Sequence, residues 1–225
     1  MEKFTLILGN KNYSSWSLRP WLTLSQTGAA FDEIVIPLWL PGAKEEILSL
    51  SSAGEVPILR HGNALGDIVI WESLAICEYL AECLPDSGLW PEDPAVRAVA
   101  RAVSHEMHGG FMAVRRAMPM NCRASRPGKG MADGVADDIA RITAIWRDCR
   151  DRFGSGGDGG GDFLFGGFTI ADAMFAPMIS RFATYGVQTD PVSDRYRDAV
   201  LDLPSMRKWM DDARAEPWTV ESFEI

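Results

Sequence analysis

The segment Gly9-Asn10-Lys11-Asn12-Tyr13-Ser14-Ser15-Trp16-Ser17 joins two apolar runs that have different periodicities. The run before it, residues 4–8, is short and stops at a Gly-Asn pair, which predicts a buried strand. After it, Leu18, Trp21 and Leu22 recur at helical spacing, so a helix is predicted to begin near Ser15 or Ser17. Unpaired N–H groups and the positive end of the helix dipole lie at such a start. Serine there is either an N-cap or part of a functional site, and this segment alone leaves both open.

The composition is that of an ordinary folded chain. Of its 225 residues, 47% are hydrophobic and 24% are charged, which excludes a wholly disordered protein. The formal net charge of −9 argues against a nucleic-acid partner. No apolar run approaches the ~18 residues of a membrane span, and the first residues lack the basic flank of a secretory signal. We therefore expect a soluble, cytoplasmic protein that does not bind a membrane.

Three patterns that could indicate a metal or a nucleotide are incomplete. His105 and His108 are spaced differently from the histidines of zinc proteases, and no third ligand is evident, so no metal is predicted. The glycine-rich residues 154–162 lack the Lys-Ser/Thr of a phosphate-binding loop. The cysteines have no C-x-x-C spacing, which excludes a zinc knuckle and a dithiol redox motif. They are Cys77, Cys83, Cys122 and Cys149.

Residues 1–84 alternate between strand and helix signals. A second strand is predicted over residues 31–38, a short helix over residues 43–50, and a hairpin from Val56-Pro57 to residue 70, with its turn at residues 61–63. Pro57 has no N–H to donate to a ladder, so it must stand at the first residue of its strand. Glu72-Ser73 then opens another helix. This order predicts an open sheet with helices on its faces.

The remaining residues carry helical signals alone. Residues 85–91 are rich in turn-forming residues and are predicted to be a linker to an all-helical domain over residues 92–225. Asp93-Pro94 starts a helix whose apolar line is predicted to run without a break to Met118. A second long helix covers residues 139–153, and Thr169 with Asp172 resembles a capping box. The fold class is thus α/β followed by all-α.

Four motifs in this order resemble the glutathione S-transferase family, in its serine-type branch of zeta- and theta-like bacterial members. They are the serine pair after the first strand, Val56-Pro57 at a strand start, Glu72-Ser73 at a helix start, and Thr169–Asp172 in an all-helical second domain. The resemblance covers nearly the whole chain. It implies a thioredoxin-like N-terminal domain, a cis peptide bond before Pro57, a homodimer, and glutathione as the co-substrate.

The resemblance also implies how glutathione is held. The backbone of Val56 would pair with the cysteinyl unit of the peptide, as a sheet edge pairs with an extended strand. Ser73 would hold the γ-glutamyl carboxylate at a helix N-terminus, and Glu72 would take the α-ammonium group. The family's usual contact to the glycyl carboxylate is replaced around residues 54–55, so Lys44 or Arg19 is predicted to substitute for it.

Ser14 or Ser15 is predicted to donate a hydrogen bond to the glutathione sulfur, with Ser14 slightly favoured. Such a bond and the helix N-terminus both favour the thiolate, which is the nucleophile. Tyr13 leaves a tyrosine-type mechanism open. Trp16 stands where zeta-like members have cysteine, and this counts against maleylacetoacetate isomerase activity.

The predicted function is a glutathione transferase, of the kind used in detoxification, that attacks small hydrophobic electrophiles. A glutathione-dependent isomerase or peroxidase and a non-catalytic glutathione-binding protein are the alternatives. Several residues are candidates for contact with the electrophile, with ordinary core packing or a solvated surface as the other interpretation. They are Tyr13, Trp39, Leu40, Met107, His108, Phe111 and Arg115.

Overall fold

A four-stranded mixed sheet forms the N-terminal half of the protein. The computed structural model describes residues 3–63, 66–154 and 160–224. Strands β1 (Lys3–Leu8), β2 (Phe31–Val35), β3 (Ile58–Asn63) and β4 (Gly66–Trp71) lie in the order β2-β1-β3-β4. β1 and β2 are parallel, and β3 is antiparallel to both β1 and β4. β3 continues through residues 61–63, where the sequence had predicted the hairpin turn, because these residues pair with β4.

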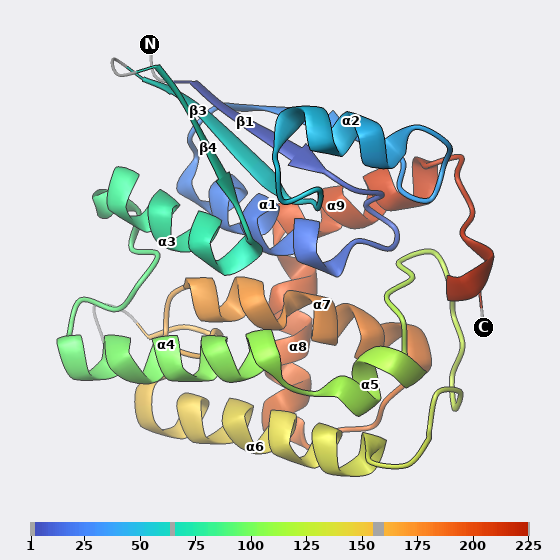
Figure 1. Cartoon of the computed structure of the whole chain (residues 1–225). Helices are drawn as coiled ribbons and strands as arrows, with labels where there is room; N and C mark the ends of the chain where they lie inside the picture. Colours follow the sequence, from blue (N-terminus) through green and yellow to red (C-terminus); the bar gives the residue numbers. More distant parts are fainter. Residues whose placement is uncertain (1–2, 64–65, 155–159, 225) are drawn as a thin grey trace.

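Helices cover both faces of this sheet (Figure 1). α1 (Ser15–Thr27) and α3 (Ser73–Cys83) lie on one face, and α2 (Ala43–Leu50) lies on the other. α2 packs Ile47 against the sheet residues Ile7 and Ile58 in a small separate core. Because α1 connects β1 to its parallel neighbour, it is a crossover helix, and its N-terminus lies beside the end of β1. The sequence-predicted helix start near Ser15 is confirmed.

The C-terminal half is helical, as predicted. Its helix α7 contacts α1, α4 and α8, so one large core joins this half to the sheet through α1. The predicted capping box is present at the start of α7. The predicted linker, residues 85–91, lies between α3 and α4, and the domain boundary there stays a prediction. The elements are η1 (Pro85–Ser87), α4 (Pro94–Gly109), α5 (Met112–Ala117), α6 (Val135–Phe153), α7 (Ile170–Tyr185), α8 (Pro191–Asp202), α9 (Pro204–Ala215) and η2 (Glu221–Phe223).

The predicted unbroken helix from residue 94 to Met118 is wrong. α4 ends at Gly109, and Phe111 then adopts a left-handed conformation with φ of 62° before α5 begins. The break occurs at a Gly-Gly pair, which is a poor helix former. A Cβ on Gly110 would lie 2.7 Å from the carbonyl oxygen of Glu106, so the chain needs glycine here to change direction. This turn sets which residues of α4 and α5 face the sheet half.

The peptide bond between Val56 and Pro57 is cis, as the resemblance implied. Pro57 immediately precedes β3, where no ladder hydrogen bond from its nitrogen is needed. Among the residues that the structure describes, no helix has the length and apolar character needed to cross a bilayer.

Candidate active site

Ser14 is the N-cap of α1. Its Oγ accepts a hydrogen bond from the backbone N–H of Ser17 (3.3 Å) and donates one to Ser17 Oγ (2.8 Å). Ser17 Oγ also accepts the N–H of Gly9 (3.0 Å), which ties the end of β1 to the start of α1. The hydroxyl proton of Ser14 is therefore engaged inside the protein, and this serine closes the helix end as an N-cap normally does.

Ser15 is the first residue of α1, and its hydroxyl is arranged differently. Its Oγ accepts a hydrogen bond from Arg181 Nη2 of α7 (3.4 Å). Within residues 3–63, 66–154 and 160–224, no acceptor receives the hydroxyl proton of Ser15. Both serines are 7% exposed and line the same cavity. Ser15 can therefore donate to a ligand without losing a contact of the fold.

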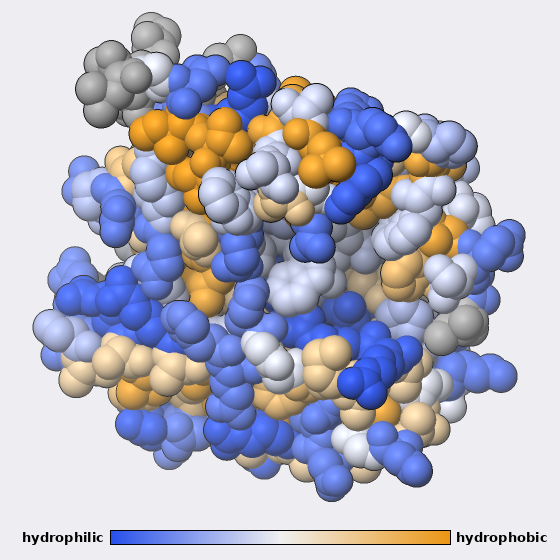
Figure 2. Space-filling view, in the orientation of Figure 1, coloured by the Kyte–Doolittle hydropathy of each residue, from blue (hydrophilic) through white to orange (hydrophobic). Residues whose placement is uncertain are grey.

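A cavity of about 720 Å³ lies between the sheet half and the helical half. Figure 2 shows this face of the molecule hollowed between the two halves, and Figure 1 shows α1, α2 and α5 around that place. Many residues predicted for the site line this cavity. These are Tyr13, Ser14, Ser15, Trp39, Leu40, Lys44, Val56, His108 and Arg115.

A second cavity of about 220 Å³ adjoins the first, because Trp16, Glu55, Val56 and His108 line both. Pro57, Glu72 and Ser73 line the second cavity. The residues that the resemblance assigns to glutathione thus border two adjoining cavities, with the predicted thiol-activating serines in the larger one and the start of α3 in the smaller one.

Glu72 is the N-cap of α3 in an uncommon conformation for a residue other than glycine, with φ of 76°. Its carboxylate accepts the N–H groups of Leu74 (3.3 Å) and Ala75 (3.2 Å) and the hydroxyl of Ser73 (3.2 Å). Backbone strain of this kind occurs often at functional sites. Ser73 and Glu72 are therefore held together at the helix N-terminus.

His108, at the C-terminal end of α4, faces the Glu72 carboxylate, with Nε2 3.5 Å from Oε1. Burial lowers the pKa of His108, while the charge of Glu72 acts in the opposite direction. A lowered pKa leaves the imidazole mostly neutral at neutral pH. His108 thus adds a polar group to the junction of the two cavities rather than a full charge.

Lys44 and Arg19 were the two candidates for the glycyl carboxylate. Lys44 lines the larger cavity, and its Nζ donates to the carbonyl oxygen of Gly54 (2.6 Å). Arg19 is fully buried, stacks on the ring of Trp16 at 4.3 Å, and is absent from the described lining of both cavities. Lys44 is the candidate with access to a ligand.

Two predicted pocket residues belong to the core instead. Met107 and Phe111 are buried in the main hydrophobic cluster, and neither is among the described residues that line the cavities. For Phe111 the turn after Gly109 explains this difference, because it directs the following residues away from the line that a continuous helix would follow. Met107 lies before the turn, on the buried face of α4. Met112, Pro119, Met120 and Phe223 line the cavity instead, and no sequence signal had identified them.

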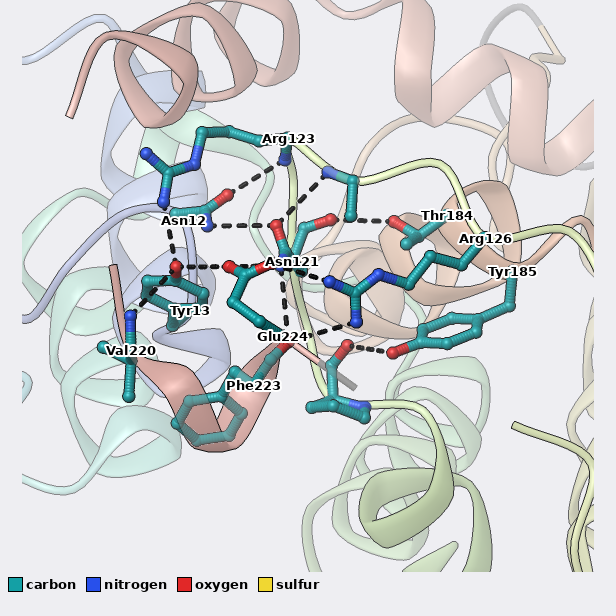
Figure 3. Close-up of polar contacts among 12 residues, drawn as sticks. Asn12, Tyr13, Asn121, Arg123, Arg126, Thr184, Tyr185, Val220, Phe223 and Glu224 are labelled. Carbon is teal, nitrogen blue, oxygen red and sulfur yellow. Dashed lines mark hydrogen bonds and ion pairs between the residues drawn. The ribbon is translucent and has the colours of Figure 1, made fainter. Parts of the chain in front are cut away.

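The hydroxyl of Tyr13 is engaged by the C-terminal segment (Figure 3). It donates to Glu224 Oε1 (2.6 Å) and accepts from Arg123 Nη2 (2.8 Å) and from the N–H of Val220 (3.2 Å). Its ring stacks on Phe223 with the centroids 5.6 Å apart. Tyr13 therefore anchors residues 220–224 as one wall of the cavity, and its hydroxyl is not available in the way that the Ser15 hydroxyl is.

The charged lining of the larger cavity is mostly cationic. Lys44, Arg115 and Arg181 line it together with the acidic Glu55, although the whole chain has a net charge of −9. The positive end of α1 also points toward Ser14 and Ser15. An anionic sulfur beside Ser15 would therefore meet a favourable potential. Among the described residues, no cluster of His, Cys, Asp or Glu could hold a metal ion.

Comparisons with known proteins relate both halves of the chain to one family. A model of the glutathione S-transferase N-terminal domain matches residues 13–83, and one of the C-terminal domain matches residues 132–212. A probable maleylacetoacetate isomerase from Caenorhabditis elegans is 25% identical over 198 residues, which cover 85% of this chain and 86% of that protein. A glutathione S-transferase structure from the Antarctic clam Laternula elliptica has a TM-score of 0.70 and 27% identity, covering 95% of this chain and 94% of that one. A glutathione transferase homologue from Burkholderia with bound glutathione has the same fold, with a TM-score of 0.67 and 24% identity, covering 95% of this chain and 100% of that one.

Proposed function

The chain belongs to the glutathione S-transferase family, and on that premise we propose that it binds glutathione and activates the thiol for attack on small hydrophobic electrophiles. The observation that carries this proposal is that the two cavities adjoin each other. Ser15 lines one, Ser73 lines the other, and Val56 lines both. A peptide thiol held by its γ-glutamyl end at α3 and by Val56 would extend toward the N-terminus of α1.

In this proposal the Ser73 hydroxyl exchanges its 3.2 Å bond to Glu72 for one to the γ-glutamyl carboxylate, and Glu72 takes the α-ammonium group. Val56 pairs with the cysteinyl backbone, and Lys44 takes the glycyl carboxylate. The serine that contacts the sulfur is Ser15, because its proton is free while that of Ser14 is bonded to Ser17. The thiol loses its proton to solvent water, and the thiolate attacks the electrophile. The apolar walls contributed by Trp39, Leu40 and their neighbours would receive that second substrate.

Glutathione binding and turnover test the proposal separately. Calorimetry should show binding at millimolar glutathione or below, and Ser73→Ala should weaken it by about tenfold or more, because a hydrogen bond to a charged group contributes ~1.5–3 kcal/mol. Leu48→Ala, an exposed change on α2 that is absent from the described lining of the cavities, serves as the control. No binding to the wild-type protein would overturn both the function and the site. Binding without turnover of aryl halides, peroxides or dicarbonyls would favour a non-catalytic binding protein.

A glutathione-dependent isomerase is the second candidate, and the match to the probable maleylacetoacetate isomerase of C. elegans favours it. Trp16 stands against it, since zeta-like members of the family have cysteine at this position. Isomerisation of maleylacetoacetate, measured beside aryl halide conjugation, decides between the two: isomerase turnover that far exceeds conjugation would make the isomerase the main activity.

The resemblance also supports a homodimer with a role in detoxification, and we propose a cytoplasmic location. Sedimentation at micromolar concentration tests the dimer. Fractionation of the source cells tests the location, and sensitivity of a deletion strain to electrophiles tests the role.

A further inference from the structure

Arg181 extends from α7 to the base of the larger cavity, where it reaches Ser15. Its Nε donates to the carbonyl oxygen of Met118 (2.8 Å), its Nη1 to that of Pro177 (3.0 Å), and its Nη2 to Ser15 Oγ (3.4 Å). The side chain lies in the cavity wall and only 5% of the residue is exposed. Two carbonyl groups therefore fix the guanidinium plane so that the remaining nitrogen meets the serine oxygen.

The charge of Arg181 has no acidic partner among the residues that the structure describes. The groups that act on it electrostatically are Arg115, Cys122 and Tyr185, and none of them is a carboxylate. Burial, followed by the like charge of Arg115, lowers the pKa of Arg181 to about 9, which still leaves it cationic at neutral pH. A buried cation without a counter-ion is energetically unfavourable. An anion bound in the cavity would relieve that cost.

We propose that Arg181 positions the Ser15 hydroxyl toward the glutathione sulfur and supplies the buried positive charge that stabilises the thiolate. This inference rests on the proposed function of the site. Since Ser15 Oγ accepts from Arg181, the serine proton points away from the arginine. One hydroxyl group then separates the guanidinium from the sulfur. Arg181 is a positioning residue, because it acts on the sulfur through Ser15, and the thiol proton leaves to solvent water.

A purely structural role for Arg181 makes a different prediction. If the arginine served only to hold Met118 and Pro177, its replacement would lower the stability and leave the bound thiol unchanged. In the proposed role, replacement removes an unpaired buried charge, so the stability is retained while the thiol becomes harder to ionise. The two roles are thus separated by measuring both properties on the same variants.

The test is a pH titration of the thiolate absorbance of bound glutathione. Arg181→Gln, which keeps a donor but loses the charge, should raise the thiol pKa by about one unit or more, because an opposite charge within ~4–6 Å shifts a pKa by 1–3 units. Arg181→Lys should recover most of that shift. Glutathione affinity at a pH where the thiol is protonated should stay within about threefold of wild type. Arg147→Gln, which removes an arginine of α6 paired with Asp190, the N-cap of α8, is the control and should give the wild-type thiol pKa.

Each outcome decides one question. If the wild-type protein binds glutathione and Arg181→Gln leaves the thiol pKa unchanged, the inference fails while the proposed function stands. If the wild-type protein does not bind glutathione, the proposed function itself fails. Adding Ser15→Ala to Arg181→Gln should raise the pKa by less than the sum of the single changes, and an additive shift would refute action through Ser15. Arg181→Met replaces the glutamine variant if that one does not fold.

Discussion

Alanine substitutions at the two adjacent serines should affect two different properties. Ser14 caps α1 through Ser17, so Ser14→Ala removes a helix cap and one donor to Ser17 Oγ. Loss of a serine N-cap costs about 1 kcal/mol of stability. For a chain of this size, that corresponds to a fall of roughly 2–4 °C in Tm. The pKa of the bound glutathione thiol should stay at the wild-type value.

Ser15→Ala should leave the stability nearly unchanged and raise the pKa of the bound glutathione thiol. Its hydroxyl contributes to the described fold a single 3.4 Å contact with Arg181, so Tm should change little. A hydrogen bond to a charged group contributes ~1.5–3 kcal/mol, and 1.36 kcal/mol corresponds to one pKa unit. The thiol pKa of bound glutathione should therefore rise by roughly one to two units. Conjugation measured at a pH below the wild-type thiol pKa should slow by about tenfold for each unit, since the thiolate fraction falls with that shift.

Thermal unfolding and the thiolate titration, each run on both variants, give a two-by-two comparison. The expected pattern is a stability loss for Ser14→Ala alone and a pKa shift for Ser15→Ala alone. The reverse pattern would refute the assignment drawn from the hydrogen bonds. A thiol pKa unchanged in both variants would transfer the role to Tyr13 and reopen the tyrosine-type mechanism.

Further changes test other parts of the site and fold. Tyr13→Phe leaves the partners of its hydroxyl unpaired, so unfolding should become easier by about 1–3 kcal/mol while the thiol pKa is kept; an unchanged denaturation midpoint would contradict the anchoring role. Trp39→Ala removes a side chain that lines the cavity and belongs to a residue 57% exposed. The KM for an apolar electrophile should therefore rise by several-fold to about tenfold, with glutathione affinity unchanged. Burial raises the pKa of Asp172 from 3.8 to about 6, so protonation of this carboxyl favours the folded state. The stabilising effect of that proton is full below pH 3.8 and is lost as the pH rises through about 6. Urea unfolding should show this trend in the wild-type protein and lose it in Asp172→Asn. Iodoacetamide should label the half-buried Cys83 first, because burial raises the thiol pKa of the other three cysteines to about 11 or 12. Peptide mapping that found those three labelled as fast as Cys83 would contradict this expectation.

Local features of the sequence determined the elements that carry the site. A short apolar run before Gly9, and the helical spacing that starts after Ser15, are properties of neighbouring residues, and they located β1 and α1 correctly. The same holds for Pro57 at the start of β3 and for the capping box at α7. The Gly109-Gly110 pair was equally local, yet the apolar periodicity through it masked the break between α4 and α5.

Contacts between distant segments decided the rest. The Ser14 proton is bonded locally, to Ser17, but the contact that orients the Ser15 hydroxyl comes from Arg181, a residue of α7. The position of the Tyr13 hydroxyl depends on Glu224, near the other end of the chain.

By itself, therefore, the sequence determined the order of the elements and the motifs at their ends, because caps, turns and periodicity arise from residues close together along the chain. Only the tertiary structure decided how the Ser15 hydroxyl is oriented and which charges surround it. Those properties depend on the packing of α7 and the C-terminal segment against α1, and no local pattern encodes them.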